Sequence, residues 1–332
     1  KDLTTLLNDV SVSEEVAALM QDWIEHKDES EGTRQRAEKL KSALAELGSE
    51  FDSIRARQDQ FVKPTQWMIG GDGWAYDIGF GGIDHVIASG ADVNMLVMDN
   101  EVYANTGGQV SKGTPRSAIE KFSAAGKVAA KKDLGFMAMT YGNVYVAQIA
   151  SGANKMQTIK AFEEAERHNG PSIIIAYTPC ISHGLRGGMS QTIREAKEAV
   201  ESGYWQLYRY NPNLEDMGKN PLTLDFKKPD FDKMTEFMTQ QVRFASLQRI
   251  KPDTAQALFD KTTADARRKF VRYARMSGDL DKFLAKEAKA KGEETVLVTS
   301  SKVERPKREK DPEAEARRAA KRAERAAKRA GK

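Results

Sequence analysis

Short apolar runs alternate with longer amphipathic stretches from about residue 64 onward, and this alternation strongly constrains the fold. Four runs are typical of buried strands: QWMIG (66–70), VNMLVMD (93–99), VYVAQIA (144–150) and SIIIAY (172–177). Helices are expected between and after them, near 77–90, 115–130, 154–168 and 189–202. Thr114 and Pro115 resemble a helix start, with a capping residue before a proline. The order predicts an α/β fold, a mostly parallel sheet with helices on both faces.

The rest of the chain differs in composition from this α/β region, so four parts are expected. They are a helical N-terminal segment at 1–60, the α/β domain at 61–215, a helical C-terminal extension at 216–295 and a charged low-complexity tail at 296–332. Within the extension, 214–230 is predicted to be a loop and 231–292 to be helical. The tail has no apolar face, which predicts a disordered or transiently helical segment.

Composition excludes several classes of protein. No run of about 18 apolar residues and no secretory signal are present, so neither membrane insertion nor secretion is expected. A single cysteine, Cys180, forms no internal disulfide and indicates a reducing, cytoplasmic compartment. Residues 302–332 contain 13 Lys/Arg and 6 Asp/Glu, but without aromatic residues or a motif this charge does not predict nucleic-acid binding. The chain begins without methionine, and we expect it to be part of a longer protein.

Gly71-Asp72-Gly73 lies between the first predicted strand and the following helix. Glycines allow close approach of a ligand, and a helix N-terminus offers N–H groups to phosphate. Alone, the tripeptide is more typical of a turn. However, 26 residues separate Gly73 from Asn100, which ends the next strand. Because consecutive parallel strands usually lie close together, both side chains are expected to reach one Mg²⁺ ion.

This spacing is similar to the diphosphate-binding motif of thiamine diphosphate enzymes. The segment GDGWAYDIGFGGIDHVIASGADVNMLVMDNEVYANTGGQVSKGTP (71–115) resembles the thiamine-binding domain of pyruvate:ferredoxin (flavodoxin) oxidoreductases. The resemblance extends over roughly 60–215, weakens to about 275 and is absent from the tail. It implies a thiamine diphosphate-binding fold.

The resemblance also implies roles for individual residues. Mg²⁺ would be held by Asp72, the side chain of Asn100 and the main-chain carbonyl of Val102. The family often has Thr at the position of Asn100, but Asn still offers one oxygen. The remaining implied cofactor-binding residues are Gly71, Gly73 and Trp74 along the diphosphate, and Glu101, Tyr103, Ala104 and Asn105 around the cofactor. Asn105 would lie near the thiazolium and the bound 2-oxo acid. The alternative for residues 105–109 is a plain glycine turn without a role in binding.

Cys180 follows the fourth predicted strand. A lone cysteine is most often a small buried apolar residue. In the resembled family, a cysteine in this segment is the fourth ligand of the [4Fe–4S] cluster nearest the thiamine. Such a cluster needs four thiolates, so three would come from outside this chain. A packing role is favoured for the histidines, and contact with substrate or cluster is the alternative for His183.

The resemblance implies a function in oxidative decarboxylation of pyruvate to acetyl-CoA and CO₂. Electrons would pass through [4Fe–4S] clusters to ferredoxin or flavodoxin. The implied partners are pyruvate, coenzyme A, the remaining domains of the same enzyme and a second copy in a homodimer. Three alternatives stay open: an oxidoreductase for another 2-oxo acid, a non-redox thiamine decarboxylase or carboligase, and a non-catalytic interaction module of the same fold.

Overall fold

The computed structural model describes residues 3–9 and 12–291, so the predicted tail at 296–332 lies outside the described residues. The chain divides into two compact units, Lys1–Phe283 and Leu284–Lys332. The boundaries expected at residues 60, 215 and 295 stay predictions. Within the described residues, no helix is long and apolar enough to cross a bilayer.

The N-terminal segment is helical, as its sequence predicts. Its helices are α1 (Leu3–Asp9), α2 (Glu14–His26), α3 (Thr33–Ala45) and α4 (Asp52–Arg55). Ser13 caps α2, accepting a hydrogen bond from the Val16 N–H at 3.3 Å. The segment has its own apolar core, in which the buried face of α3 meets residues of the other helices: Met20, Ala37, Leu40, Leu44 and Phe51.

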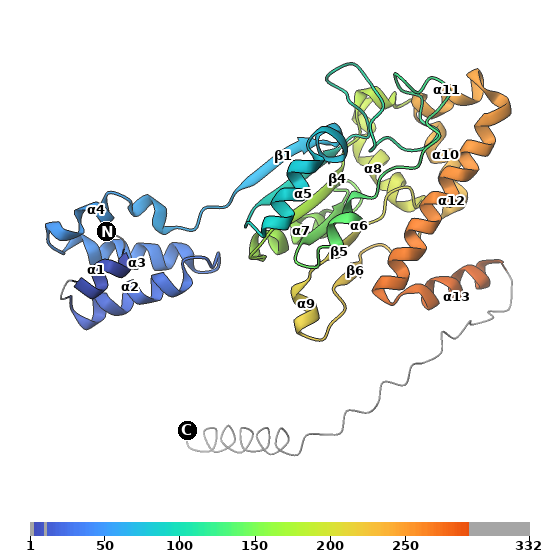
Figure 1. Cartoon of the computed structure of the whole chain (residues 1–332). Helices are drawn as coiled ribbons and strands as arrows, with labels where there is room; N and C mark the ends of the chain where they lie inside the picture. The colour runs from blue at the N-terminus through green and yellow to red at the C-terminus, as the bar shows by residue number, and fades with distance from the viewer. Residues whose placement is uncertain (1–2, 10–11, 292–332) are drawn as a thin grey trace, which may run out of the picture. The chain divides into compact units, whose positions relative to one another are not determined.

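Six strands form one sheet in the order β1-β2-β4-β3-β5-β6. Figure 1 shows this sheet, with β1, β4, β5 and β6 labelled. The first four are parallel: β1 (Trp67–Gly71), β2 (Asn94–Asp99), β3 (Tyr145–Ile149) and β4 (Ser172–Tyr177). These are the four strands that the sequence predicts. The other two, β5 (Tyr208–Tyr210) and β6 (Leu222–Leu224), pair in antiparallel fashion beyond β3. The predicted α/β fold with a mostly parallel sheet is confirmed.

Apolar residues cover both faces of this sheet. The helices that follow the strands are α5 (Phe80–Ser89), α6 (Leu134–Met139), α7 (Lys155–Arg167) and α8 (Thr192–Glu201). On one face, Val97 and Ile175 pack with Ile83 of α5 in the main core. On the other face, Ile174 packs with Ala161 of α7 in a smaller core. Successive side chains of a strand point to opposite faces of the sheet, so each of the four parallel strands contributes apolar residues to both cores.

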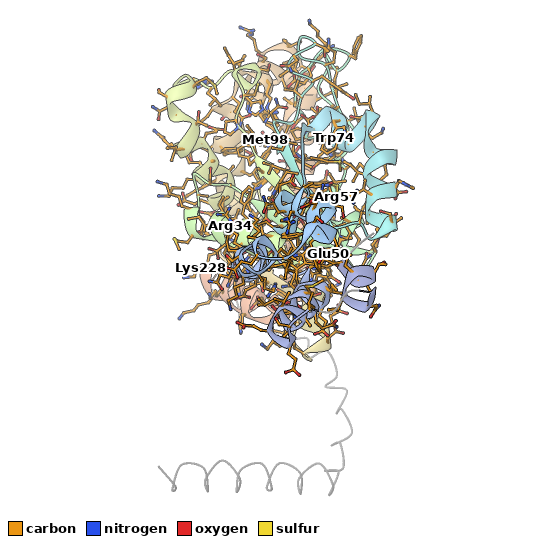
Figure 2. All side chains as sticks on the ribbon, turned by 90° about the vertical axis from the view of Figure 1, so that its left-hand side faces the viewer. Arg34, Glu50, Arg57, Trp74, Met98 and Lys228 are labelled. Carbon is orange, nitrogen blue, oxygen red and sulfur yellow. The ribbon has the colours of Figure 1, made fainter. Side chains whose placement is uncertain are left out.

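One strand is less buried than its sequence predicts. β1 is at the edge of the sheet, and its Ile69 side chain is 66% exposed. Met98 of β2, labelled in Figure 2 together with Trp74, is also exposed. An edge strand has a neighbour on one side only, which fits the exposure of Ile69 but not that of Met98, because β2 lies between β1 and β4.

The helix predicted at 115–130 is wrong, because the structure has an irregular loop there. Ser117 and Phe122 have φ values of 69° and 67°, which no right-handed helix contains. Ser117 N–H donates to the Lys127 carbonyl at 2.8 Å, so the loop closes on itself. Thr114 does not cap a helix; its hydroxyl donates to the Glu101 carbonyl at 2.6 Å.

The region after residue 207 contains regular structure that the sequence predicts only in part. The loop expected at 214–230 contains β6 and the end of α9 (Asn213–Asp216), and β5 was not predicted. The expected helices follow as α10 (Met234–Thr239), α11 (Val242–Ile250), α12 (Pro252–Ser277) and α13 (Leu280–Lys291). Pro252 begins α12, where its missing N–H costs no helical hydrogen bond.

Candidate functional site

Three neighbouring strands end at the same edge of the sheet. β1 ends at Gly71, β2 at Asp99 and β4 at Tyr177, and β2 lies between the other two. The loops after β2 and β4 are joined by a hydrogen bond from Thr178 N–H to the Asp99 carbonyl, at 3.0 Å. Ligands of open parallel sheets bind at such carboxyl ends, so this edge is the candidate site.

Asp72 stands between β1 and a helical turn of unusual geometry. Residues Gly73–Ile78 form a π-helix, in which Gly79 N–H donates to the Trp74 carbonyl five residues earlier, at 2.8 Å. π-turns of this kind are frequent at functional sites. The Asp72 side chain is buried, so its carboxylate is shielded from water.

Asp72 and Asn100 lie close together, and the main-chain carbonyl of Val102 lies beside them. With its amide nitrogen facing the other two residues, Asn100 donates to Asp72 Oδ1 at 2.5 Å and to the Val102 carbonyl at 2.8 Å. A half-turn of the amide brings its oxygen to the same place. A carboxylate, an amide and a carbonyl oxygen can then face one centre, which suits the oxygen preference of Mg²⁺.

The electrostatics of Asp72 also fit a cation. Burial, and secondarily the nearby Asp99 carboxylate, raise the pKa of Asp72 to about 7. Ser111 partly opposes this shift by donating its hydroxyl to Asp72 Oδ2 at 2.5 Å. A buried carboxylate that is costly to ionise would gain from a bound divalent cation. Among the described residues, no group of three or more His, Cys, Asp or Glu side chains could hold a metal, so any metal site depends on amide and main-chain oxygens as well.

The two glycines beside Asp72 have different surroundings. A Cβ at Gly73 would lie 2.2 Å from Tyr103 Cε1, and the Tyr103 hydroxyl donates to the Gly73 carbonyl at 3.1 Å. Gly73 is therefore required by packing against Tyr103. A Cβ at Gly71 would meet no heavy atom closer than 3.9 Å. Space remains next to Gly71, where the resemblance implies the diphosphate.

Asn105 is exposed in a tight turn and does not join the buried cluster. Tyr103 N–H donates to the Gln109 carbonyl at 3.0 Å, and Gly108 N–H donates to the Tyr103 carbonyl at 2.8 Å. Ala104 lies half-buried in the same turn. The segment is thus a glycine turn in its backbone, and its exposed face is open to a ligand.

Glu101 adopts an uncommon backbone conformation and its carboxylate is buried among cations. Its φ is 64°, a region that non-glycine residues seldom occupy. Glu101 pairs with Lys131 at 2.8 Å and with Arg243 of α11 at 2.7 Å. Burial opposes ionisation, but these two cations hold the pKa of Glu101 at about 2. Its side chain is therefore engaged within the protein, and any contact with a cofactor would use its main chain.

Lys131 extends this network to the end of β2. Its ammonium lies 2.8 Å from Asp99 Oδ2, which also accepts a hydrogen bond from the Tyr76 hydroxyl at 2.7 Å. Burial alone would lower the pKa of Lys131, but Asp99 and Glu101 raise it above its ordinary value. Residues 99–101 are thus held in place by ion pairs of Lys131 with the carboxylates at both ends, Asp99 and Glu101.

Cys180 and His183 follow β4, beside the loop that contains Asn100. Cys180 is half-buried, and its sulfur accepts a hydrogen bond from Ser182 N–H at 3.4 Å. His183 is 0% exposed, with Nε2 2.6 Å from the Asn100 carbonyl. Burial and the nearby Arg243 lower the pKa of His183 to about 3, so the ring is neutral. The ring is therefore packed inside the protein, where both of its nitrogens contact main-chain atoms.

Several residues of this site have no signal in the sequence. Ser111 is one polar residue in a loop, and Lys131 and Arg243 are single cations among many. Each reaches the site from far along the chain, so only the fold brings it near Asp72 or Glu101.

Comparison with known families identifies the type of domain. Residues 53–176 match the family model described as "Thiamine pyrophosphate enzyme, C-terminal TPP binding domain". The matched residues span β1 to β3 and nearly all of β4, so this α/β region is the C-terminal domain of a thiamine pyrophosphate enzyme.

The curated relatives of this chain are named as pyruvate oxidoreductases. The chain is 53% identical over 281 residues to the pyruvate-flavodoxin oxidoreductase of Klebsiella pneumoniae, 84% of this chain and 24% of that protein. It is 51% identical to the enzyme of the same name from Enterobacter agglomerans, over 81% of this chain and 23% of that protein. It is 47% identical to the pyruvate:ferredoxin oxidoreductase of Moorella thermoacetica, over 80% and 23%. The chain spans about a quarter of the length of these curated relatives, and the resemblance to this family is confirmed.

Proposed function

We propose that this chain supplies the metal- and diphosphate-binding part of an enzyme that oxidatively decarboxylates pyruvate to acetyl-CoA and CO₂. Electrons would pass through [4Fe–4S] clusters to ferredoxin or flavodoxin. The observation that carries the proposal is the convergence of Asp72 Oδ1, the Asn100 amide and the Val102 carbonyl within 2.5–2.8 Å. The names of the relatives support the choice of pyruvate over another 2-oxo acid.

In this proposal, Asp72, Asn100 and Val102 hold Mg²⁺, and the diphosphate lies beside Gly71, Gly73 and Trp74. The main chain of Glu101, with Tyr103, Ala104 and Asn105, surrounds the cofactor. Space at Gly71 and the exposed side of the turn that contains Asn105 support this arrangement.

The chain's own contribution is binding and orientation. Bound thiamine diphosphate supplies the carbon nucleophile and the electron sink that decarboxylation requires. Asp72 and the Val102 carbonyl are buried, which excludes competing water and strengthens their interaction with a cation. The charges at Glu101, Lys131 and Arg243 keep the ligand-bearing main chain in place.

We further propose that Cys180 ligates a [4Fe–4S] cluster beside this site. Its position after β4, next to the loop of Asn100, supports the assignment. A cluster of this kind takes four thiolates, and this chain has one cysteine. The other three thiolates, and the residues that bind coenzyme A and activate the cofactor, would belong to the remaining domains of a cytoplasmic homodimer.

Calorimetry of the full-length enzyme with Mg²⁺ and thiamine diphosphate tests the proposal. Asp72→Ala should weaken cofactor binding by at least roughly 100-fold, because a metal ligand matters more than its outer partners do. Asp84→Ala is the control: Asp84 is an exposed aspartate on the following helix, α5, where its carboxylate accepts a hydrogen bond from the Tyr141 hydroxyl. Equal affinity in wild type and Asp72→Ala would remove Asp72 from the metal site.

A further inference from the structure

His183 connects the two loops to which the proposed function assigns ligands. Its Nε2 lies 2.6 Å from the main-chain oxygen of Asn100, and its Nδ1 lies 3.5 Å from the main-chain nitrogen of Cys180. Because a carbonyl only accepts, Nε2 carries the hydrogen and donates to Asn100. Nδ1 is then free of hydrogen and accepts from Cys180 N–H. One neutral ring thereby satisfies a donor and an acceptor from separate loops.

The imidazole is held rigidly in this position. It is fully buried, and the Tyr177 ring stacks against it with centroids 6.5 Å apart and planes 30° apart. Tyr177 ends β4 and is paired with Asp99 at the end of β2. Because the ring has so little freedom, a shift of the Asn100 carbonyl would also shift the Cys180 N–H, and the reverse holds as well.

The peptide unit between Asn100 and Glu101, which His183 contacts, has an unfavourable backbone conformation on its Glu101 side. The Asn100 carbonyl belongs to the peptide unit that precedes Glu101, whose φ of 64° is costly for a residue with a side chain. Rotation of this peptide would turn the carbonyl away from His183 and would change the φ of Glu101, the residue that lies between the proposed ligands Asn100 and Val102. The hydrogen bond from Nε2 opposes that rotation.

We propose that His183 is a positioning residue, which holds the main chain of Asn100 in place for metal binding and links it to the main chain of Cys180. This inference rests on the proposed function, in which Asn100 and Val102 are metal ligands and Cys180 is a cluster ligand. His183 itself contacts neither group, and it acts through the loops that carry them. Outer residues of this kind typically change metal affinity by roughly 10–100-fold when replaced.

Two conservative variants distinguish the contact of His183 with Asn100 from its contact with Cys180. The amide of glutamine can reach the place of Nε2, so His183→Gln retains a donor for the Asn100 carbonyl. The shorter asparagine reaches only the place of Nδ1, so His183→Asn retains the contact with Cys180 and loses the contact with Asn100. The probe is Mn²⁺ in place of Mg²⁺, titrated into the full-length protein with thiamine diphosphate, and free Mn²⁺ is followed by electron paramagnetic resonance.

The matched control is His168, a buried histidine at the opposite edge of the sheet. It follows α7, and its Nε2 lies 3.0 Å from the Asn143 carbonyl. His168→Asn therefore removes a similar contact between a ring nitrogen and a carbonyl, away from the proposed metal site. Unfolding temperatures of all three variants are measured in parallel, because a merely structural effect would change stability and Mn²⁺ affinity together.

We expect His183→Asn to weaken Mn²⁺ binding roughly 10–100-fold, and His183→Gln and His168→Asn to remain near wild type. Equal Mn²⁺ affinity of His183→Asn and His183→Gln would overturn the inference, as would the same loss in His168→Asn. The proposed function is tested separately by wild type and Asp72→Ala. If wild type binds Mn²⁺, Asp72→Ala does not and His183→Asn matches wild type, only the role of His183 is refuted. If wild type does not bind Mn²⁺, the proposed function fails and the inference fails with it.

Discussion

Glu120 is a buried carboxylic acid in the irregular loop beside the candidate site. It is 8% exposed, and its Oε1 has no hydrogen-bond partner in the part of the chain that the structure describes. Burial raises the pKa of Glu120 from 4.5 to about 7, although Arg243 partly opposes the shift. The unfolded chain loses this proton as the pH rises past 4.5, whereas the folded chain keeps it until about 7. Folding stability due to Glu120 is therefore fully present below pH 4.5 and is lost as the pH rises to about 7.

Glu120→Gln removes this dependence on pH. A pKa difference of this size corresponds to at most about 3 kcal/mol, so the variant should gain up to that amount relative to wild type between pH 4.5 and pH 8. Urea denaturation at several pH values measures the free energies of unfolding. Glu163→Gln, at an exposed position of α7, serves as the control and should run parallel to wild type. A constant difference between wild type and Glu120→Gln at every pH would contradict the assignment.

At the scale of elements, one buried ion pair joins α11 to the loop after β2. The Arg243 and Glu101 side chains are both 1% exposed and 2.7 Å apart, and the Tyr204 hydroxyl donates to the same carboxylate at 2.5 Å. Desolvation makes such a pair a modest source of net stability, but removing one partner leaves a buried charge without compensation. The loop that bears the proposed metal ligands therefore depends on a helix more than 140 residues away in the sequence.

Arg243→Met should destabilise the protein by about 3–5 kcal/mol, because Glu101 would keep only Lys131 as a cationic partner. Arg249→Met, at an exposed position of the same helix, should change stability by no more than about 0.5 kcal/mol. The double variant Glu101→Gln/Arg243→Met should recover part of the loss, since it removes both charges. Thermal and urea unfolding measure all three. A cost for Arg243→Met as small as that of Arg249→Met would show that the pair does not hold α11 to the loop.

The elements that the sequence predicts correctly are those with a strong local pattern. The run SIIIAY forms β4 because branched apolar side chains favour a strand that is buried on both faces. The helix expected at 115–130 fails because Ser117 and Phe122 take left-handed conformations, and Ile119 N–H donates to the Arg243 carbonyl instead of to a helical partner. β5 (Tyr208–Tyr210) was missed because three residues, one of them Arg209, carry too short a pattern to recognise.

In the candidate site too, residues that belong to a local sequence pattern could be predicted, and residues brought in by long-range contacts could not. Asp72 and Asn100 could be placed together because a strand–helix–strand unit fixes where their strands end. Ser111, Lys131 and Arg243 could not, because each contacts the site through long-range folding and has no motif of its own. The backbone of Glu101 was equally hidden, since a positive φ at a charged residue has no signature in sequence.

At the scale of the whole molecule, the chain corresponds to only part of the relatives that it matches, and this bears on the activity expected of the isolated chain. It spans about a quarter of the pyruvate-flavodoxin oxidoreductase of Klebsiella pneumoniae, and it contains one cysteine where a [4Fe–4S] cluster takes four thiolates. Under the proposed function, the 332-residue chain alone lacks the other cluster ligands and the rest of the active site. We therefore expect the purified chain to fold but not to oxidise pyruvate.

Anaerobic reduction of methyl viologen, with pyruvate and coenzyme A supplied together, tests this expectation. The isolated chain should show no reduction above the rate without coenzyme A, whereas a full-length enzyme that includes this chain should show it. Iron and acid-labile sulfide, measured on the same samples, should be absent from the isolated chain and present in the full-length enzyme. Coenzyme A-dependent reduction by the chain alone would mean that a complete site lies within these 332 residues. An active full-length enzyme free of iron would instead favour a non-redox thiamine decarboxylase, in which Cys180 needs no cluster.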